Sequence, residues 1–274
     1  MPISQDYKDE EHSIFLPVPF ITRMGERFNA AMDVVGGLAR LALEFVRCLW
    51  TFKPELGEIA RQLSMIGNRS FSIVALTALF TGFVMALQLA VGLGRFGLKL
   101  YVGQVVALAV FRELGPVLTA LMVAARVGSG IAAELGSMVV TEQVLAIEAM
   151  GANPVQKLVV PRVLATIIAT PVLAVMADVI GVFGGMIIMI REAGVTPQFY
   201  IDQIQKTLIT GDFTSGILKA AFFGFFVAII SCYQGLETSG GTEGVGKSTT
   251  RAVVYASITI FISDFFLTKL ILYF

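Results

Sequence analysis

Five stretches of the chain are each long and apolar enough to cross a lipid bilayer as a helix. They are residues 70–94, 101–125, 163–190, 217–236 and 252–273. A helix rises about 1.5 Å per residue, so about 20 residues cross the ~30 Å hydrocarbon core. Backbone polar groups must be satisfied internally in lipid, and helices do this within one segment. The pattern predicts an all-α integral membrane protein whose membrane domain covers residues 70–274.

Composition agrees with a membrane protein and excludes several classes of function. Of the 274 residues, 56% are hydrophobic and 15% are charged, and the net charge of zero gives no indication of nucleic-acid binding. Cys48 and Cys232 lack metal-ligand spacing, and the one histidine, His12, lies in a polar tail. GxSxG and HExxH motifs are also missing, so we expect neither an intramembrane enzyme nor a cofactor held by the chain itself.

The first 69 residues differ from the rest. Residues 1–21 form a polar tail without the features of a cleaved signal peptide. Residues 22–52 carry charges at intervals of three, four or seven, with apolar residues opposite, which predicts an amphipathic helix lying in the membrane interface. The alternative is a surface helix of a small soluble domain. Residues 53–69 are predicted to be a polar connection with a short helical pattern, which completes an interfacial unit over residues 22–69.

Charged residues occur inside the predicted spans. Arg112 and Glu113 lie near the middle of residues 101–125, where each charge costs at least about 2.5 kcal/mol to insert. Both side chains should therefore face protein, water or a polar ligand, and they are candidate functional residues. The alternative is an ion pair that only holds helices together. The sequence assigns no role to the other charges within the spans, which are Asp178, Lys219, Asp264 and Lys269.

A polar segment, residues 126–162, separates the second and third spans. Within it, residues 137–151 predict a short helix, begun by Ser137 or Thr141 and ended by Gly151. Such a helix is too short and too charged to cross the bilayer, so it should lie at the membrane surface. Spacing alone does not distinguish a binding surface from an ordinary loop.

Residues 111–165 resemble the signature region of the MlaE family of ABC-transporter permeases. The resemblance includes RELGPVLTA, AAELGSM, TEQ and VVPR in this order, and it extends more loosely over residues 60–274. It implies a homodimeric permease driven by a separate cytoplasmic ABC ATPase, which would bind the ATP. It also implies that phospholipid moves between the inner membrane and a periplasmic MCE-domain protein and supports outer-membrane lipid asymmetry, and it allows a small cytoplasmic STAS-type subunit.

The resemblance also assigns roles to particular residues. It implies that residues 137–151 are the coupling helix that docks into the ATPase. The residues expected to serve this coupling are Glu134, Glu142, Gln143, Glu148, Met150 and Gly151. The chain departs from the family pattern at Leu145, where an acidic residue is usual. Arg112 and Glu113 fall in the matching RELGP motif, so we expect Arg112 near a lipid phosphate and Glu113 as its partner or as a conformational latch.

A Walker A pattern occurs near the C-terminus, at GTEGVGKS, residues 241–248. A P-loop requires an entering strand, a following helix and a second strand that supplies a magnesium ligand. Here the segment lies between two predicted spans, which leaves no room for a nucleotide-binding domain. We therefore interpret its glycines as a tight cytoplasmic turn and expect a transport subunit without ATPase activity.

The distribution of basic residues predicts the topology. The N-terminal segment, residues 126–162 and the loop before the last span hold most of the Lys and Arg residues outside the spans. The positive-inside rule then places the N-terminus in the cytoplasm and, after five spans, the C-terminus in the periplasm of a multi-pass inner-membrane protein. The alternative function is an ion-coupled secondary transporter that uses Glu113, Asp178 and Asp264 as protonatable groups.

Overall fold

The computed structural model describes residues 20–51 and 56–273, and in these residues the chain is helical without strands. Five helical rods are long and apolar enough to cross a membrane. They are α2 (Leu56–Gly94), a composite rod over Lys99–Val140, a second composite rod over Val155–Ala193, α9 (Thr210–Leu236) and α10 (Gly241–Tyr273). The predicted all-α membrane fold is confirmed.

The composite rods alternate between α-helix and π-helix. The first contains a 3₁₀ turn η1 (Lys99–Tyr101), α3 (Val102–Ala109), η2 (Val110–Leu114), α4 (Gly115–Val123), η3 (Ala124–Gly128) and α5 (Ser129–Val140). The second consists of η4 (Val155–Val159) and α7 (Val160–Ala193). Prolines follow two of the π-helical stretches, Pro116 after η2 and Pro161 after η4. Proline has no N–H, so the regular hydrogen-bond ladder is interrupted there and the backbone widens.

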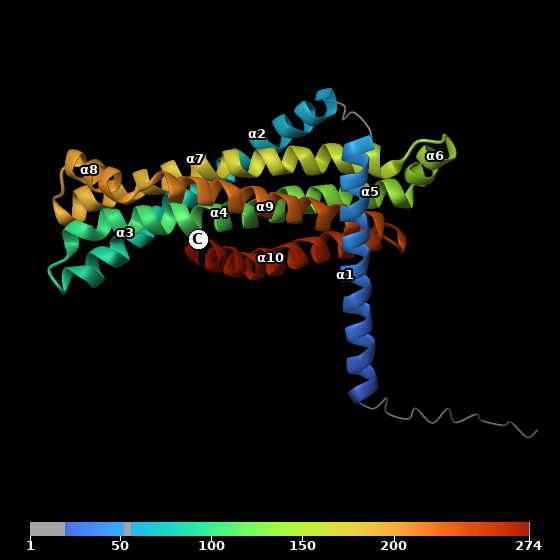
Figure 1. The fold of residues 1–274 in the computed structure, drawn as a ribbon, viewed down its shortest axis with the longest axis horizontal. Helices are drawn as coiled ribbons and strands as arrows, with labels where there is room; N and C mark the ends of the chain where they lie inside the picture. Colours follow the sequence, from blue (N-terminus) through green and yellow to red (C-terminus); the bar gives the residue numbers. More distant parts are fainter. Residues whose placement is uncertain (1–19, 52–55, 274) are drawn as a thin grey trace, which may run out of the picture.

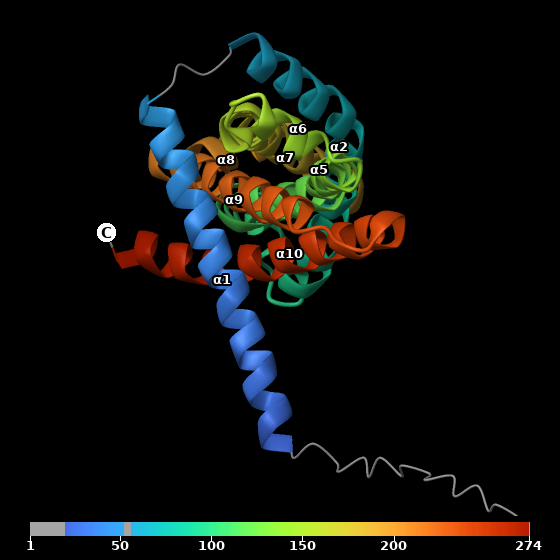
Figure 2. The same cartoon turned by 90° about the vertical axis from the view of Figure 1, so that its right-hand side faces the viewer.

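The rods lie side by side, whereas α1 (Phe20–Thr51) crosses one end of them at a steep angle (Figure 1). Figure 2 shows α1 running across that end of the bundle. On its buried side, Leu41, Phe45 and Cys48 pack against residues of α7 and α9. This orientation is the one expected for a helix that lies in the plane of the membrane surface.

The predicted polar connection before the first span is helical from Leu56, in agreement with its helical pattern, and it is continuous with the span. From Leu56 the helix continues without a break to Gly94. Ile59 and Ile66 recur at helical spacing and pack against Ala165 and Ala169 of α7. Contact with α7 therefore extends the helix beyond the part that hydropathy identified.

Small residues bring α2 and α7 into close contact. A Cβ atom added to Gly82 would lie 1.9 Å from the carbonyl oxygen of Gly181, and one added to Gly184 would lie 2.7 Å from that of Leu79. Such approaches are typical of helix packing in membranes, where van der Waals contact replaces the hydrophobic effect between helices. The two helices therefore share an extensive, closely packed interface.

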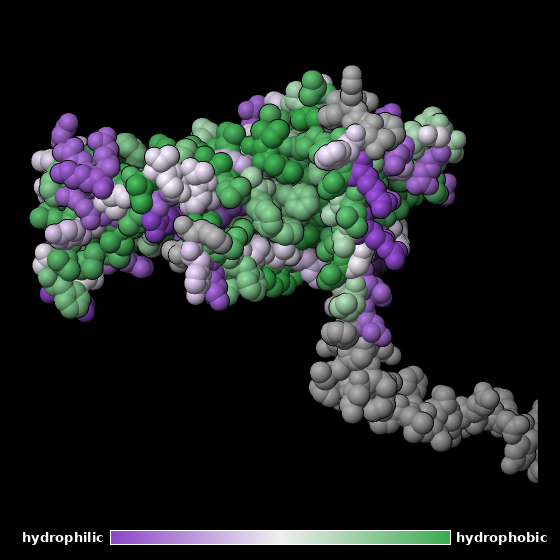
Figure 3. All heavy atoms as spheres, viewed as in Figure 1, coloured by the Kyte–Doolittle hydropathy of each residue, from purple (hydrophilic) through white to green (hydrophobic). Residues whose placement is uncertain are grey.

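The two ends of the bundle are more polar than its middle. Hydrophobic residues cover much of the middle, and hydrophilic residues gather over α8 (Pro197–Thr207) at one end and over α1 and α6 (Gln143–Ala149) at the other (Figure 3). Thr196 precedes α8, and its hydroxyl accepts a hydrogen bond from the N–H of Phe199. This hydropathy pattern matches a bilayer that surrounds the middle of the rods.

Candidate functional site

Arg112 and Glu113 both lie in η2, but they do not pair with one another. Arg112 binds Asp212 through Nε and Nη2, each 2.6 Å from Oδ1, and Glu113 binds Lys219, with Nζ 2.8 Å from Oε2. The expectation that Glu113 is the partner of Arg112 is therefore wrong. Adjacent residues of a helix point in different directions, whereas Asp212 and Lys219 are seven residues apart and share one face of α9.

Lys219 is the centre of this charged group. Its side chain is only 2% exposed, and its Nζ lies 2.8 Å from Glu113, 3.2 Å from Asp264 Oδ1 and 2.7 Å from Thr268 Oγ1. Thr268 in turn donates to Glu113 Oε2 at 3.2 Å. A buried ammonium group requires such anionic and polar partners. These contacts join η2, α9 and α10. We call the residues involved the charged network: Arg112, Glu113, Asp212, Lys219, Asp264 and Thr268.

Backbone geometry explains why the network forms at this point. Pro116 cannot donate to the carbonyl of Arg112, and Lys219 Nζ donates to that carbonyl instead, at 3.0 Å. Gly216 lets α9 approach, because a Cβ atom there would lie 2.5 Å from the carbonyl oxygen of Phe111. Asp212 is fixed a second time, since its Oδ2 accepts the N–H of Ile209 at the start of α9.

The charges of the network are paired with one another, but two of its side chains are partly exposed. Each of its two cations already contacts a carboxylate, while the side chains of Arg112 and Glu113 remain 40% and 38% exposed. Asp178 does not join it. This carboxylate is buried in α7 against Gly115, and its Oδ1 has no hydrogen-bond partner in the described part of the chain. Of the three carboxylates of the alternative transporter, Glu113 and Asp264 therefore share Lys219, whereas Asp178 has no contact with this lysine.

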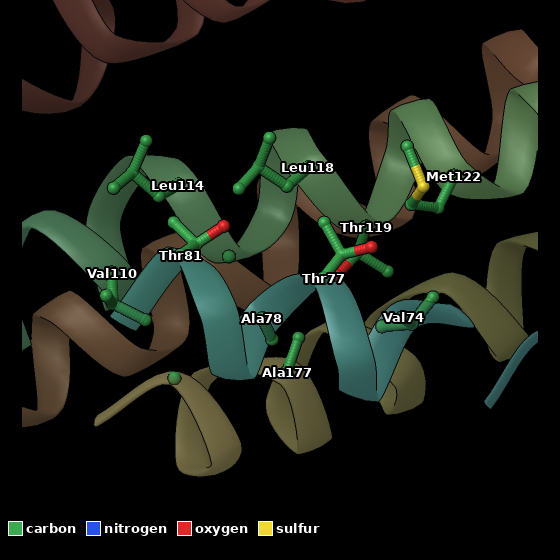
Figure 4. A pocket seen from close by; sticks show the side chains of 12 residues that line it. Val74, Thr77, Ala78, Thr81, Val110, Leu114, Leu118, Thr119, Met122 and Ala177 are labelled. Carbon is green, nitrogen blue, oxygen red and sulfur yellow. The ribbon is translucent and has the colours of Figure 1, made fainter. Parts of the chain in front are cut away.

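An apolar groove lies between α2 and the η2–α4 segment. The groove has a volume of about 600 Å³, and its lining includes Phe80 and Val84 of α2 with Leu114 and Leu118 of the facing rod. A narrow inner pocket of about 20 Å³ continues from it toward Thr119 (Figure 4). Leu114 directly follows Glu113, so one short π-helical segment presents charged groups on one face and an apolar groove on another.

The predicted coupling helix is shorter than expected. Ser137 belongs to α5, and α6 begins only after Glu142, whose left-handed φ of 59° reverses the chain. The prediction that Ser137 or Thr141 begins the helix is therefore wrong. Its end is as predicted, because Gly151 adopts a φ of 78° that favours glycine.

Five of the six predicted coupling residues lie at the tip of this hairpin. These five exposed residues are Glu142, Gln143, Glu148, Met150 and Gly151. The sixth, Glu134, lies in α5 and binds Arg162 of α7 at 3.0 Å. The tip projects from the same end of the bundle that α1 crosses (Figure 1). It offers an exposed surface on which another protein can dock.

The Walker A-like segment does not form a phosphate-binding loop. Residues 241–248 are the first turns of α10, and Lys247 is paired with Glu243 at 2.7 Å. The prediction that its glycines form a tight turn holds only for Gly241, which turns with Gly240 at positive φ, whereas Gly244 and Gly246 are helical. With these residues helical, their backbone N–H groups cannot surround a phosphate as a P-loop does.

Sequence reasoning identified Arg112 and Glu113 but missed their partners. Asp212, Lys219, Asp264 and Thr268 are far from η2 in the sequence. The sequence did contain a sign of these partners: Lys219 and Asp264 lie inside apolar stretches, where each charge requires a counter-charge. Pairing the two with Glu113 would have predicted the centre of the network.

Comparison with known proteins agrees with this geometry. The permease MlaE family matches residues 59–270. A probable ABC transporter permease protein of Rickettsia felis is 45% identical over 247 residues, which cover 90% of this chain and 95% of the relative. The chloroplastic protein TRIGALACTOSYLDIACYLGLYCEROL 1 of Arabidopsis thaliana is 38% identical over 209 residues, 76% of this chain and 60% of the relative.

A third relative has a more specific name. The intermembrane phospholipid transport system permease protein MlaE of Haemophilus influenzae is 34% identical over 258 residues, covering 92% of this chain and 97% of that protein. The family match covers the charged network and the α5–α6 hairpin together. The chain belongs to the MlaE family of permeases, and it is a multi-pass membrane subunit of an ABC transporter rather than the ATPase.

Proposed function

We propose that this permease moves phospholipid between the inner membrane and a periplasmic MCE-domain protein. The observation that carries the proposal is the juxtaposition at η2 of a charged network and an apolar groove of about 600 Å³. A phospholipid has the same division into a charged head and apolar tails, and the groove volume lies within the usual range for ligand sites. The Haemophilus influenzae relative is named for phospholipid transport, and the proposed movement would contribute to outer-membrane lipid asymmetry.

In this mechanism the half-exposed side chains hold the headgroup. Asp212 occupies two N–H groups of Arg112, and the other guanidinium N–H groups have no acceptor in the described part of the chain. They are available to a phosphate oxygen without breaking the pair. Glu113 and Lys219 then act as the latch, because a shift of α10 would change the contacts of Asp264 and Thr268 with Lys219.

The energy would come from a separate cytoplasmic ATPase that binds the ATP. Its docking surface would be the exposed tip of the α5–α6 hairpin, residues 137–151. The basic residues around α1 and α6 support a cytoplasmic location for this end, with the N-terminus inside and the C-terminus in the periplasm of a bacterial inner-membrane protein. A homodimer would enclose the groove between two copies, and a small STAS-type subunit would be a further partner.

Transport by purified components tests the proposal. The chain is purified with its bound ATPase and MCE protein, placed in liposomes, and assayed for ATP-dependent movement of fluorescent phospholipid. Arg112→Ala and Glu113→Ala should reduce transport while the complex still assembles, whereas Lys247→Gln, in an exposed pair on α10, should not. Unchanged transport in the first two variants would remove the role of the charged network. Movement driven by a proton gradient without ATP would instead support the secondary transporter.

A further inference from the structure

An ion pair joins the two limbs of the hairpin that carries α6. Glu134 lies on the outgoing limb, α5, and Arg162 lies on the returning limb, at the start of α7. Their side chains meet with Arg162 Nη2 3.0 Å from Glu134 Oε1. The Arg162 side chain is only 7% exposed, whereas that of Glu134 is 57% exposed. The pair therefore connects the two limbs at the base of the hairpin.

Arg162 also fixes the irregular backbone of the returning limb. Its Nη1 donates a hydrogen bond of 2.7 Å to the carbonyl oxygen of Leu158 in η4. The neighbouring Pro161 has no N–H with which to complete the ladder in this region. One guanidinium group thus binds the π-helical stretch and the opposite limb at the same time, which makes the base of the hairpin a single unit.

A second ion pair lies in the first turns of α2, which pack against α7. Glu58 accepts hydrogen bonds from Arg61 at 2.8 Å and from Gln62 at 3.0 Å. This pair belongs to α2 itself, so the link between α2 and the hairpin base is the packing of α2 against α7.

Apolar packing continues the same connection into the bundle. One turn beyond Arg162, Ala165 and Ala169 of α7 pack against Ile59 and Ile66 of α2. Further along, α2 supplies one wall of the apolar groove. A series of packed contacts thus leads from the hairpin base through α7 and α2 to the groove, and packed side chains and rigid helices of this kind can carry coupling between two sites.

We propose that Arg162 is a positioning residue that makes the hairpin base and the beginning of α2 move as one body. Movement of α6 by a docked ATPase would then reach the wall of the groove through α2. The role in transport rests on the proposed function, but the mechanical connection lies within this chain and requires no partner protein. Without Glu134 the buried guanidinium would lose its counter-charge, so the pair should persist while the hairpin moves.

Hydrogen exchange of the purified chain in nanodiscs tests the mechanical connection without any partner. The variants are Glu134→Gln, Arg162→Gln and the charge swap Glu134→Arg with Arg162→Glu. Both single variants should speed exchange in residues 155–160 and also in residues 56–66, and the swap should restore protection. The matched control is Lys247→Gln, which breaks the exposed pair with Glu243. Faster exchange in residues 155–160 alone would overturn the connection to α2.

The second arm measures phospholipid moved per ATP hydrolysed by the reconstituted complex. Single variants should lower this ratio about two- to thirtyfold, the range expected for positions that carry coupling between sites, while ATPase binding persists. The swap should recover it, and an unchanged ratio would refute the role in transmission. If the wild-type complex moves no phospholipid, the proposed function fails, and the exchange experiment alone decides the connection. Glu134→Gln alters a half-exposed side chain, so it tests the same ion pair if the buried Arg162 variants fail to fold.

Discussion

Replacing Lys219 with methionine should destabilise the protein strongly. The substitution removes the ammonium group that contacts Glu113, Asp264, Thr268 and the carbonyl of Arg112. Breaking a buried ion pair costs about 3–5 kcal/mol because the remaining charge has no partner. Glu113 and Asp264 are partly exposed, so we expect the lower end, about 3 kcal/mol. At about 2–4 °C per kcal/mol, the melting temperature should fall by roughly 6–12 °C.

A thermal unfolding assay in one fixed detergent measures this loss. The informative control is the triple variant Lys219→Met, Glu113→Gln, Asp264→Asn, which also removes the carboxylates left without a partner. It should recover most of the lost melting temperature, because neutral amides cost less to bury than unpaired charges. A single variant as stable as the wild type, or a triple variant less stable than the single one, would refute the account of the charged network.

Three further changes test other parts of the structure. Gly82→Leu should destabilise the α2–α7 contact by several kcal/mol, because even its Cβ would lie 1.9 Å from the Gly181 carbonyl oxygen; thermal unfolding measures this. Glu142→Arg with Met150→Arg should reduce the amount of ATPase that co-purifies without changing the melting temperature, since both side chains are exposed. Burial, assisted by Glu44, raises the pKa of the Cys48 thiol, so maleimide labelling at pH 7 should be slower than at an exposed introduced cysteine and should accelerate as pH rises.

Hydropathy predicted the existence and order of the spans, but not their full lengths. The rods extend beyond the apolar stretches at both ends, as at Leu56 and Val140. These polar turns are held by contacts such as Ile59 with Ala165, which depend on the position of a helix distant in the sequence. A pattern within one segment carries no information about such contacts. The break at Glu142 was missed for another reason, because glutamate is uncommon in the left-handed conformation.

The site was predictable in part, because a charge inside the membrane requires an explanation wherever it occurs. Arg112 and Glu113 were identified in this way, and so were Lys219 and Asp264 as unexplained charges. Their pairing depends on the rotation of α9 and α10 about their axes, which the sequence does not give. The adjacency of Arg112 and Glu113 suggested the wrong pair, since neighbours on a helix face different partners.

Photocrosslinking is the most direct test of the claim that a phospholipid occupies the groove beside the charged network. A photoreactive amino acid replaces Leu118 in the groove or, as the control, Ile258 on the exposed face of α10. Mass spectrometry then identifies the lipids attached to each position. The account predicts that Arg112→Ala lowers the phospholipid adduct at position 118 but not at position 258. Equal labelling at position 118 with and without Arg112→Ala would contradict it.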